Sequence, residues 1–262
     1  MASKDYGRII RKKNVTYLER WSCSLEDIVV LMIIVIVASL LQTSTGYGFS
    51  IIGTPFLFLL YPVHMAIQIN IILSICLSMF MIFKIRKEVD YTLFTRLIKG
   101  SILGLIAGIF VYLFLDIQLL KMTVGIIILV LTVLLIFQVT IQRTERKDYV
   151  TGGISGMLTT SIGVPGPPLL LYFSGAGIDK TTLRSTTLAY YLFVYFASLM
   201  MQILFGGTNK ETWMLSFIAI PALIIGVLLG QWLFKWISQL TFLIVTCLIL
   251  LFTGGYLFFT SL

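Results

Sequence analysis

The sequence predicts an all-α polytopic membrane protein with about eight transmembrane helices in two four-helix repeats, the first helix of each repeat being broken at mid-membrane. Three observations predict this class. The 262 residues are 58% apolar and only 11% charged, whereas soluble domains are about a quarter charged. The apolar runs provide about eight spans of about 20 residues each. Two clusters of glycine, proline and hydroxyl residues, at 44–55 and 161–173, interrupt these runs at corresponding places.

The order of basic and apolar segments along the sequence divides the chain into four predicted parts. They are a basic cytoplasmic tail at 1–24, a first transmembrane repeat at 25–142, a cytoplasmic linker at 143–148 and a second transmembrane repeat at 149–262. The first apolar run, from about residue 28, is long enough to be a retained helix rather than a cleaved signal peptide. Later apolar runs bounded by charges predict spans at about 63–83, 92–114, 118–142, 149–174, 179–205, 211–236 and 239–261.

Basic residues set the predicted orientation. They gather in the tail, after the second span and in the linker, which the positive-inside rule places in the cytoplasm. We therefore expect a multi-pass protein of the plasma (inner) membrane with both termini cytoplasmic. Four single crossings per half predict parallel repeats related by an axis along the membrane normal. The alternative is that the broken segments are re-entrant hairpins, which would permit inverted repeats; the charge rule favours single crossings.

An internal repeat supports the division into halves. Gly46 aligns with Gly163 at an offset of 117 residues. Small residues also recur at four-residue spacing in the third and seventh spans, where they let helices approach closely in lipid. We assign these residues to helix packing: Gly100, Gly104, Gly108, Ala222, Gly226 and Gly230.

Each break predicts a half-helix that begins inside the membrane. Pro165, Pro167 and Pro168 suit the first turn of a new helix, and the first break precedes a short helix that ends near Leu60. Broken backbone at this depth must be buried in protein or line a wet cavity. The amides and the positive dipole end of a half-helix would then form an anion site. The alternative is that glycine and proline only kink two helices for packing.

The candidate substrate-binding residues surround the two breaks and extend into the more polar helix that follows each of them. Arg184 would attract the anion, or else extend to the membrane interface. The full set is Ser44, Thr45, Gly46, Gly48, Ser50, Gln68, Asn70, Ser161, Gly163, Val164, Pro165, Gly166, Arg184 and Thr187.

Several function classes are not supported by the sequence. All eleven acidic residues lie in the tail or at predicted span ends, so a carboxylate relay or a cation site at mid-membrane is not expected. A single histidine does not predict a metal site. We expect the three cysteines to be free thiols, so they do not predict a disulfide framework. We expect no cofactor, no enzymatic activity and no nucleic-acid partner. The expected partners are a small anion, the lipid bilayer and further copies in a homo-oligomer.

The break motifs resemble those of the TauE/SafE sulfite exporter family. The likeness covers about residues 25–260 and includes the segments GVPGPPLLLY at 163–172 and LRST at 183–186. The resemblance implies a permease for sulfite, organosulfonates or related sulfur-containing anions. Where the family often has consecutive glycines in the first motif, this chain has Phe49 and Ser50 after Gly48. We therefore expect the second break to contribute more to the site.

The functional hypothesis is a secondary permease that carries a small oxyanion through a central site between the two repeats. Motion of one repeat against the other would expose this site to each side in turn. Two alternatives remain open at this stage. An anion channel would also be lined by amides, and a non-transporting membrane scaffold or accessory subunit would use the breaks for assembly.

Overall fold

The computed structural model describes residues 25–46, 49–137, 143–174 and 179–233, together with 244, 247, 248, 251, 252, 254–256 and 258, and these residues include no strand. The chain divides into two units, Met1–Val30 and Leu31–Leu262. Residues 25–30, the described part of the first unit, form the start of the first helix. The helices are α2 (Leu25–Thr45), α3 (Phe49–Leu60), α4 (Val63–Ile85), η1 (Arg86–Glu88), α5 (Tyr91–Phe114), α6 (Ile117–Ile136), α7 (Glu145–Ile162), α8 (Gly166–Ser174), α9 (Lys180–Gly206) and α10 (Lys210–Leu233).

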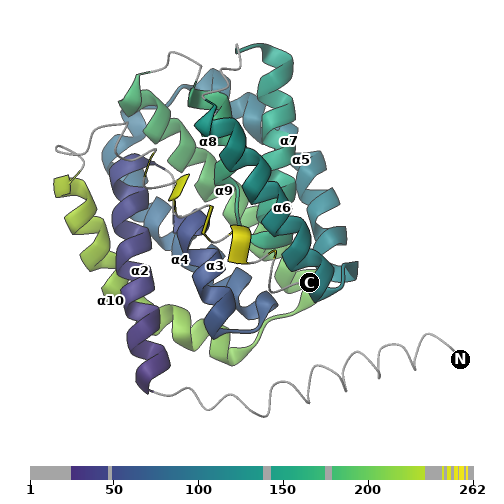
Figure 1. Ribbon diagram of the computed structural model, residues 1–262. Coiled ribbons are helices and arrows are strands. Elements are labelled where there is room, and N and C mark those ends of the chain that lie inside the picture. The colour runs from purple at the N-terminus through teal and green to yellow at the C-terminus, as the bar shows by residue number, and fades with distance from the viewer. Residues whose placement is uncertain are drawn as a thin grey trace, which may run out of the picture. The chain divides into compact units, whose positions relative to one another are not determined.

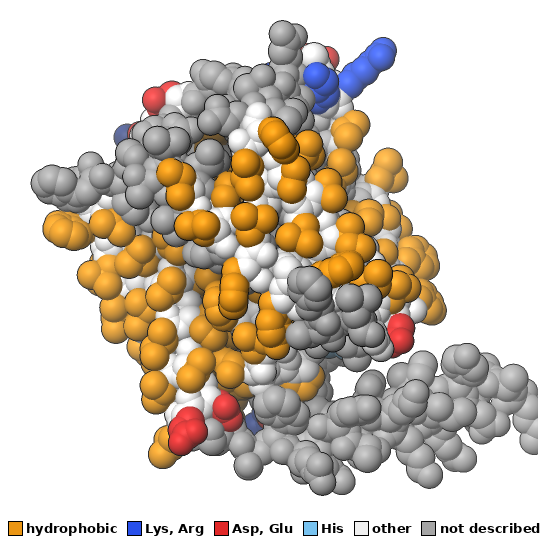
Figure 2. All heavy atoms as spheres, in the orientation of Figure 1, with side chains coloured by type: hydrophobic (Ala, Val, Ile, Leu, Met, Phe, Trp, Pro, Cys, Tyr) orange, Lys and Arg blue, Asp and Glu red, His pale blue; other side chains and the backbone are white. Residues whose placement is uncertain are grey.

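The all-helical class and the membrane character are confirmed. Five described helices are long and apolar enough to cross a bilayer: α2, α4, α5, α9 and α10. Large apolar side chains such as Leu103, Phe110 and Phe217 are more than half exposed, which suits a surface in contact with lipid. Figure 2 shows such side chains spread over the visible face, with charged side chains at its margins. The protein is therefore a multi-pass membrane protein. Of the predicted last span, only 244, 247, 248, 251, 252, 254–256 and 258 are described.

Two pairs of parallel helices pack through glycine (Figure 1). Gly104 on α5 lies so close to α7 that a Cβ would collide with the carbonyl oxygen of Gly153. Gly226 on α10 has the same relation to α2, where a Cβ would lie 2.5 Å from the carbonyl oxygen of Ile36. Ile36 and Gly153 are 117 residues apart in the sequence. The predicted packing role of these glycines is confirmed.

The segment α7–α8 is a hairpin and does not cross the membrane once, so the prediction of a single crossing is wrong here. Beyond the break, the carbonyl oxygen of Pro165 accepts a hydrogen bond of 2.9 Å from Ser155 on α7. At the far end of α8, the hydroxyl of Tyr172 donates to Asp148 Oδ1 over 2.7 Å. Because Asp148 lies in the first turn of α7, α8 returns to the end of the bundle where α7 began.

The segment α2–α3 folds back in the same way. Helix α2 runs parallel to α10, as the paired glycine contacts show. Helix α10 ends beside the end of α4, where Gln231 Nε2 lies 3.5 Å from Met81 Sδ. Helices α2 and α4 therefore point in the same direction, and α3 must carry the chain back between them. A single crossing is also wrong for this segment.

Helices α4 and α9 occupy matching places in the two halves but run in opposite directions. Gln68 near the start of α4 donates a hydrogen bond of 2.8 Å to the carbonyl oxygen of Gly207 at the end of α9. Ser185 near the start of α9 donates one of 2.7 Å to the carbonyl oxygen of Glu88, beyond the end of α4. The expectation of parallel repeats about an axis along the membrane normal is therefore wrong.

The two basic loops lie at one end of the bundle, as predicted. Arg143 Nη2 is 3.3 Å from Asp90 Oδ2, which joins the loop at 86–90 to the linker at 143–148. The part of α2 from Leu31 onward runs parallel to α4. It therefore starts at the opposite end of the bundle and runs toward the end that carries the basic loops. Residues 1–24 themselves lie outside the described residues.

Candidate functional site

The two helix breaks have the same backbone geometry. Gly46 and Gly163 have φ of 85° and 75°, in the left-handed region that glycine adopts without a steric penalty. The Gly46 amide donates to the carbonyl oxygen of Gln42, and the Gly163 amide donates to that of Thr159, both over 2.8 Å. Each glycine thus ends one helix and turns the chain toward a half-helix. The predicted positions of both breaks are confirmed.

Each break lies against a long helix of the other half. A Cβ at Gly46 would lie 3.2 Å from Cα of Arg184 on α9. A Cβ at Gly163 would lie 3.5 Å from Cγ2 of Ile67 on α4, and Asn70 Nδ2 donates to the Gly163 carbonyl oxygen over 2.8 Å. Ile67 and Arg184 are also 117 residues apart. The two breaks therefore have equivalent surroundings, with an arginine at one and an isoleucine at the other.

The half-helices α3 and α8 begin side by side. A Cβ at Gly166, the first residue of α8, would lie 2.9 Å from Cδ1 of Ile51 in the first turn of α3 and 3.2 Å from the hydroxyl of Tyr191. Since α3 and α8 run back toward opposite ends of the bundle, their positive dipole ends meet in its interior. We refer to this meeting point as the half-helix centre, formed by the first turns of α3 and α8.

The two half-helices offer different numbers of amide donors. The first four N–H groups of a helix have no acceptor within it. In α8 these positions include Pro167 and Pro168, so only Gly166 and Leu169 carry an N–H. All four positions of α3 carry one, and the amide of Phe49 donates to Gln42 Oε1 over 3.0 Å.

Two stripes of buried polar side chains run along α4 and α9, at a spacing of four residues that keeps each stripe on one helix face. Asn70 of the first stripe binds Gly163, and Tyr191 of the second lies against Gly166. On α4 they are Asn70, Ser74 and Ser78, and on α9 they are Thr187, Tyr191 and Tyr195, all nearly or fully buried. The two stripes are separated by the same 117 residues. Asn70 and Thr187 are among the predicted site residues, whereas Ser74, Ser78, Tyr191 and Tyr195 are not, although the four-residue spacing could have indicated them.

The structure brings some predicted site residues to the breaks and uses others elsewhere. Ser44 and Ser161 donate back to carbonyl oxygens of their own helices, Leu40 and Met157, over 2.6 and 2.8 Å. Gln68 binds Gly207 at the end of α9, away from the half-helix centre. The buried residues at or beside the breaks are Gly46, Ser50, Asn70, Gly163, Val164, Pro165, Gly166, Arg184 and Thr187. Gly48 and the side chain of Thr45 lie outside the described residues.

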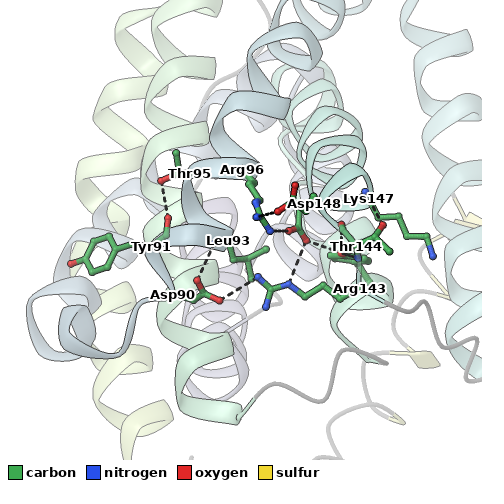
Figure 3. Close-up of polar contacts among 11 residues, drawn as sticks. Asp90, Tyr91, Leu93, Thr95, Arg96, Arg143, Thr144, Lys147 and Asp148 are labelled. Carbon is green, nitrogen blue, oxygen red and sulfur yellow. Dashed lines mark hydrogen bonds and ion pairs between the residues drawn. The ribbon is translucent and has the colours of Figure 1, made fainter.

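A charged cluster ties the second hairpin to α5 at the end that carries the basic loops (Figure 3). Asp148 is fully buried, and its carboxylate lies 3.3 Å from Arg96 Nη1 and 3.6 Å from Arg143 Nε. Arg143 also pairs with Asp90, whose Oδ1 caps α5 by accepting from the amide of Leu93 over 3.0 Å. The sequence places these acids at helix ends but does not predict this pairing, which joins residues about 50 positions apart.

The described residues contain no group of three or more His, Cys, Asp or Glu side chains that could hold a metal ion. The donors near the half-helix centre are instead backbone amides, hydroxyls and carboxamides. Such groups stabilise oxyanions by hydrogen bonding.

Comparison with known proteins gives one family match. The model of the family described as sulfite exporter TauE/SafE matches residues 31–257. No curated protein and no solved structure matches the chain.

Proposed function

Because the chain belongs to the sulfite exporter TauE/SafE family, we propose that it is a secondary permease that moves a small oxyanion, sulfite or an organosulfonate, across the cell membrane. The observation that carries the proposal is the contact between Gly166 and Ile51. It brings together the starts of two half-helices whose dipoles both favour negative charge at that point.

We further propose that the two halves are inverted repeats. The ends of α2 and α7, the starts of α3 and α8, and the starts of α4 and α9 are each separated by 117 residues. The opposite directions of α4 and α9 support inversion. Inverted repeats with discontinuous helices that meet near the midplane are typical of secondary transporters.

The end of the bundle that carries the charged cluster is the cytoplasmic end in this proposal. The positive-inside rule supports that orientation, because most basic residues from Leu31 onward lie in the loops at this end or within about three helical turns of them. They are Lys84, Arg86, Lys87, Arg96, Lys99, Arg143, Arg146, Lys147, Lys180 and Arg184.

The hairpin tips are the gates in this proposal. Gly46 closes against Arg184, near the cytoplasmic end, and Gly163 closes against Ile67, near the opposite end. Separation of one tip from its long helix would open the half-helix centre to one side only. Alternate opening of the two tips would carry the anion across.

Transport in proteoliposomes tests the proposal. Sulfite and organosulfonate should enter or leave the vesicles with saturable kinetics, and an unlabelled anion on one side should drive counterflow of a labelled one. A channel would show flux without counterflow. If no oxyanion moves, and none raises the melting temperature of the purified protein, the proposed function is wrong.

A further inference from the structure

Tyr195 is a fully buried tyrosine directed toward the half-helix centre. Its hydroxyl lies within interaction distance of the side chains of Ser50 and Ser74. Ser50 is the second residue of α3, and Ser74 belongs to the polar stripe of α4. All three residues are at most 1% exposed. Side chains from three different helices therefore bring hydroxyl groups to the place where α3 begins.

The hydroxyls of Tyr195 and Ser74 form no well-directed hydrogen bond with any described residue. A buried hydroxyl without a hydrogen bond is costly, so a polar group that stays in such a place points to a partner that binds there. The neighbouring Tyr190 shows the contrast, because its hydroxyl donates to the carbonyl oxygen of Gly152 over 3.2 Å. One tyrosine is used for packing, and the other presents its hydroxyl to the centre.

The described segments that form and border the half-helix centre carry no charged side chain. The segments 49–60, 65–83, 155–173 and 185–206 contain no Asp, Glu, Lys, Arg or His. Arg184 precedes Tyr191 by two helical turns, about 10 Å along α9, and lies against Gly46. An anion at the centre is thus stabilised by amides, hydroxyls and helix dipoles. The cost of desolvating an ion rises with the square of its charge, so this environment favours a single negative charge over two.

We propose that Tyr195, together with Ser50 and Ser74, donates hydrogen bonds to a singly charged oxyanion held at the first turns of α3 and α8, and that the centre discriminates against doubly charged oxyanions. The inference rests on the proposed function and adds to it the charge class of the substrate and its side-chain donors.

Thermal protection of the purified protein tests the inference. Methanesulfonate, which is singly charged, and sulfate, which is doubly charged, are compared at one neutral pH and equal ionic strength. Methanesulfonate should raise the melting temperature of the wild type, and sulfate should leave it unchanged. Tyr195→Phe should need about tenfold more methanesulfonate for the same shift, the effect of one lost hydrogen bond to a charged group. Tyr190→Phe is the matched control and should keep the wild-type affinity.

Each contrary result has a distinct meaning. Equal affinity in Tyr195→Phe and Tyr190→Phe would show that Tyr195 is not a ligand. Protection by sulfate at the same concentrations as methanesulfonate would refute the charge selectivity. If Tyr195→Phe does not fold, Ser74→Ala replaces it, with the same expected loss of about tenfold. If neither a sulfonate nor sulfite raises the melting temperature of the wild type, the proposed function and this inference are both wrong.

Discussion

The two hairpins share a backbone path but differ in how they are fastened. In α7–α8, Ser155 binds Pro165 and Tyr172 binds Asp148, so α8 is held at both ends. In α2–α3, the positions 117 residues before Ser155, Asp148 and Tyr172 are Ala38, Leu31 and Pro55. None of these three side chains can form the equivalent hydrogen bonds. Polar side-chain fastening is thus concentrated in the second hairpin.

The number of first-turn amide donors, in contrast, is larger in the first hairpin than in the second. Two prolines reduce the first-turn amides of α8 to two, whereas α3 keeps four, one of which binds Gln42. The sequence motif favours the second break as the anion site, because its glycines and prolines match the family better. The geometry suggests instead that the two half-helices have different roles. Helix α8 is held in place at both ends, and α3 supplies more of the amide donors.

Asp148→Leu gives the second hairpin the residue that the first hairpin has at this position. We expect a loss of about 3 kcal/mol in stability, because removing one member of a buried ion cluster leaves its partners uncompensated. The expected loss is at the lower end of the usual range, since Arg96 and Arg143 are about a quarter exposed. The melting temperature in detergent is the measurement.

Glu145→Gln is the matched control for this substitution. Glu145 also pairs with Arg96, but its side chain is 71% exposed. We therefore expect a loss below about 1 kcal/mol. Equal effects of the two substitutions would show that the buried carboxylate does not fasten the hairpin.

Gly163→Ala and Gly46→Ala compare the two break tips. Each places a side chain at positive φ, which costs about 1–2 kcal/mol. Gly163→Ala should cost about 1 kcal/mol more, because its Cβ would lie 3.0 Å from Asn70 Nδ2 and disturb that hydrogen bond. Equal melting temperatures for Gly163→Ala and Gly46→Ala would show that the contact between Gly163 and Asn70 does not make the second tip more sensitive to an added side chain.

Tyr172→Phe tests the far end of the second hairpin. The lost hydrogen bond to the Asp148 carboxylate should cost about 2 kcal/mol. Amide exchange of α8 should become faster, while that of α3 stays unchanged. Tyr149→Phe is the control, because that side chain is 40% exposed. If α8 exchanges at the same rate with and without the Tyr172 hydroxyl, the fastening of this hairpin lies elsewhere.

Local sequence patterns predicted the helices and the breaks but not the path of the chain between them. Apolar runs gave α4, α5, α9 and α10 to within a few residues, and glycine and proline marked where α3 and α8 begin. Whether a half-helix continues across the membrane or folds back depends on contacts such as Tyr172 to Asp148, which join positions 24 residues apart. No local pattern encodes such a contact, so the single crossing was a reasonable but wrong prediction.

The candidate site shows the same limit. The prediction groups Gln68 with Asn70 because both are polar residues on one helix, yet two residues correspond to about 200° of rotation. Asn70 accordingly reaches Gly163, whereas Gln68 reaches Gly207 on the other side. Tyr195 is not among the predicted site residues. Its spacing of eight residues from Thr187, two steps of four on one helix face, was the available signal.

Arg184 provides the smallest expected effect and distinguishes the two breaks by charge. It lies beside Gly46, whereas the equivalent residue beside Gly163 is Ile67. At a separation of about 10 Å, and with Glu88 offsetting part of its field, Arg184 should stabilise an anion at the half-helix centre by on the order of 1 kcal/mol. Arg184→Gln should therefore weaken methanesulfonate protection about fivefold. Lys180→Gln, one turn earlier on α9, should have a smaller effect because the distance is greater. Equal effects of Arg184→Gln and Lys180→Gln would mean that Arg184 acts only as one more positive charge at the membrane interface. The arginine would then give the first break no electrostatic advantage over the second in binding the anion.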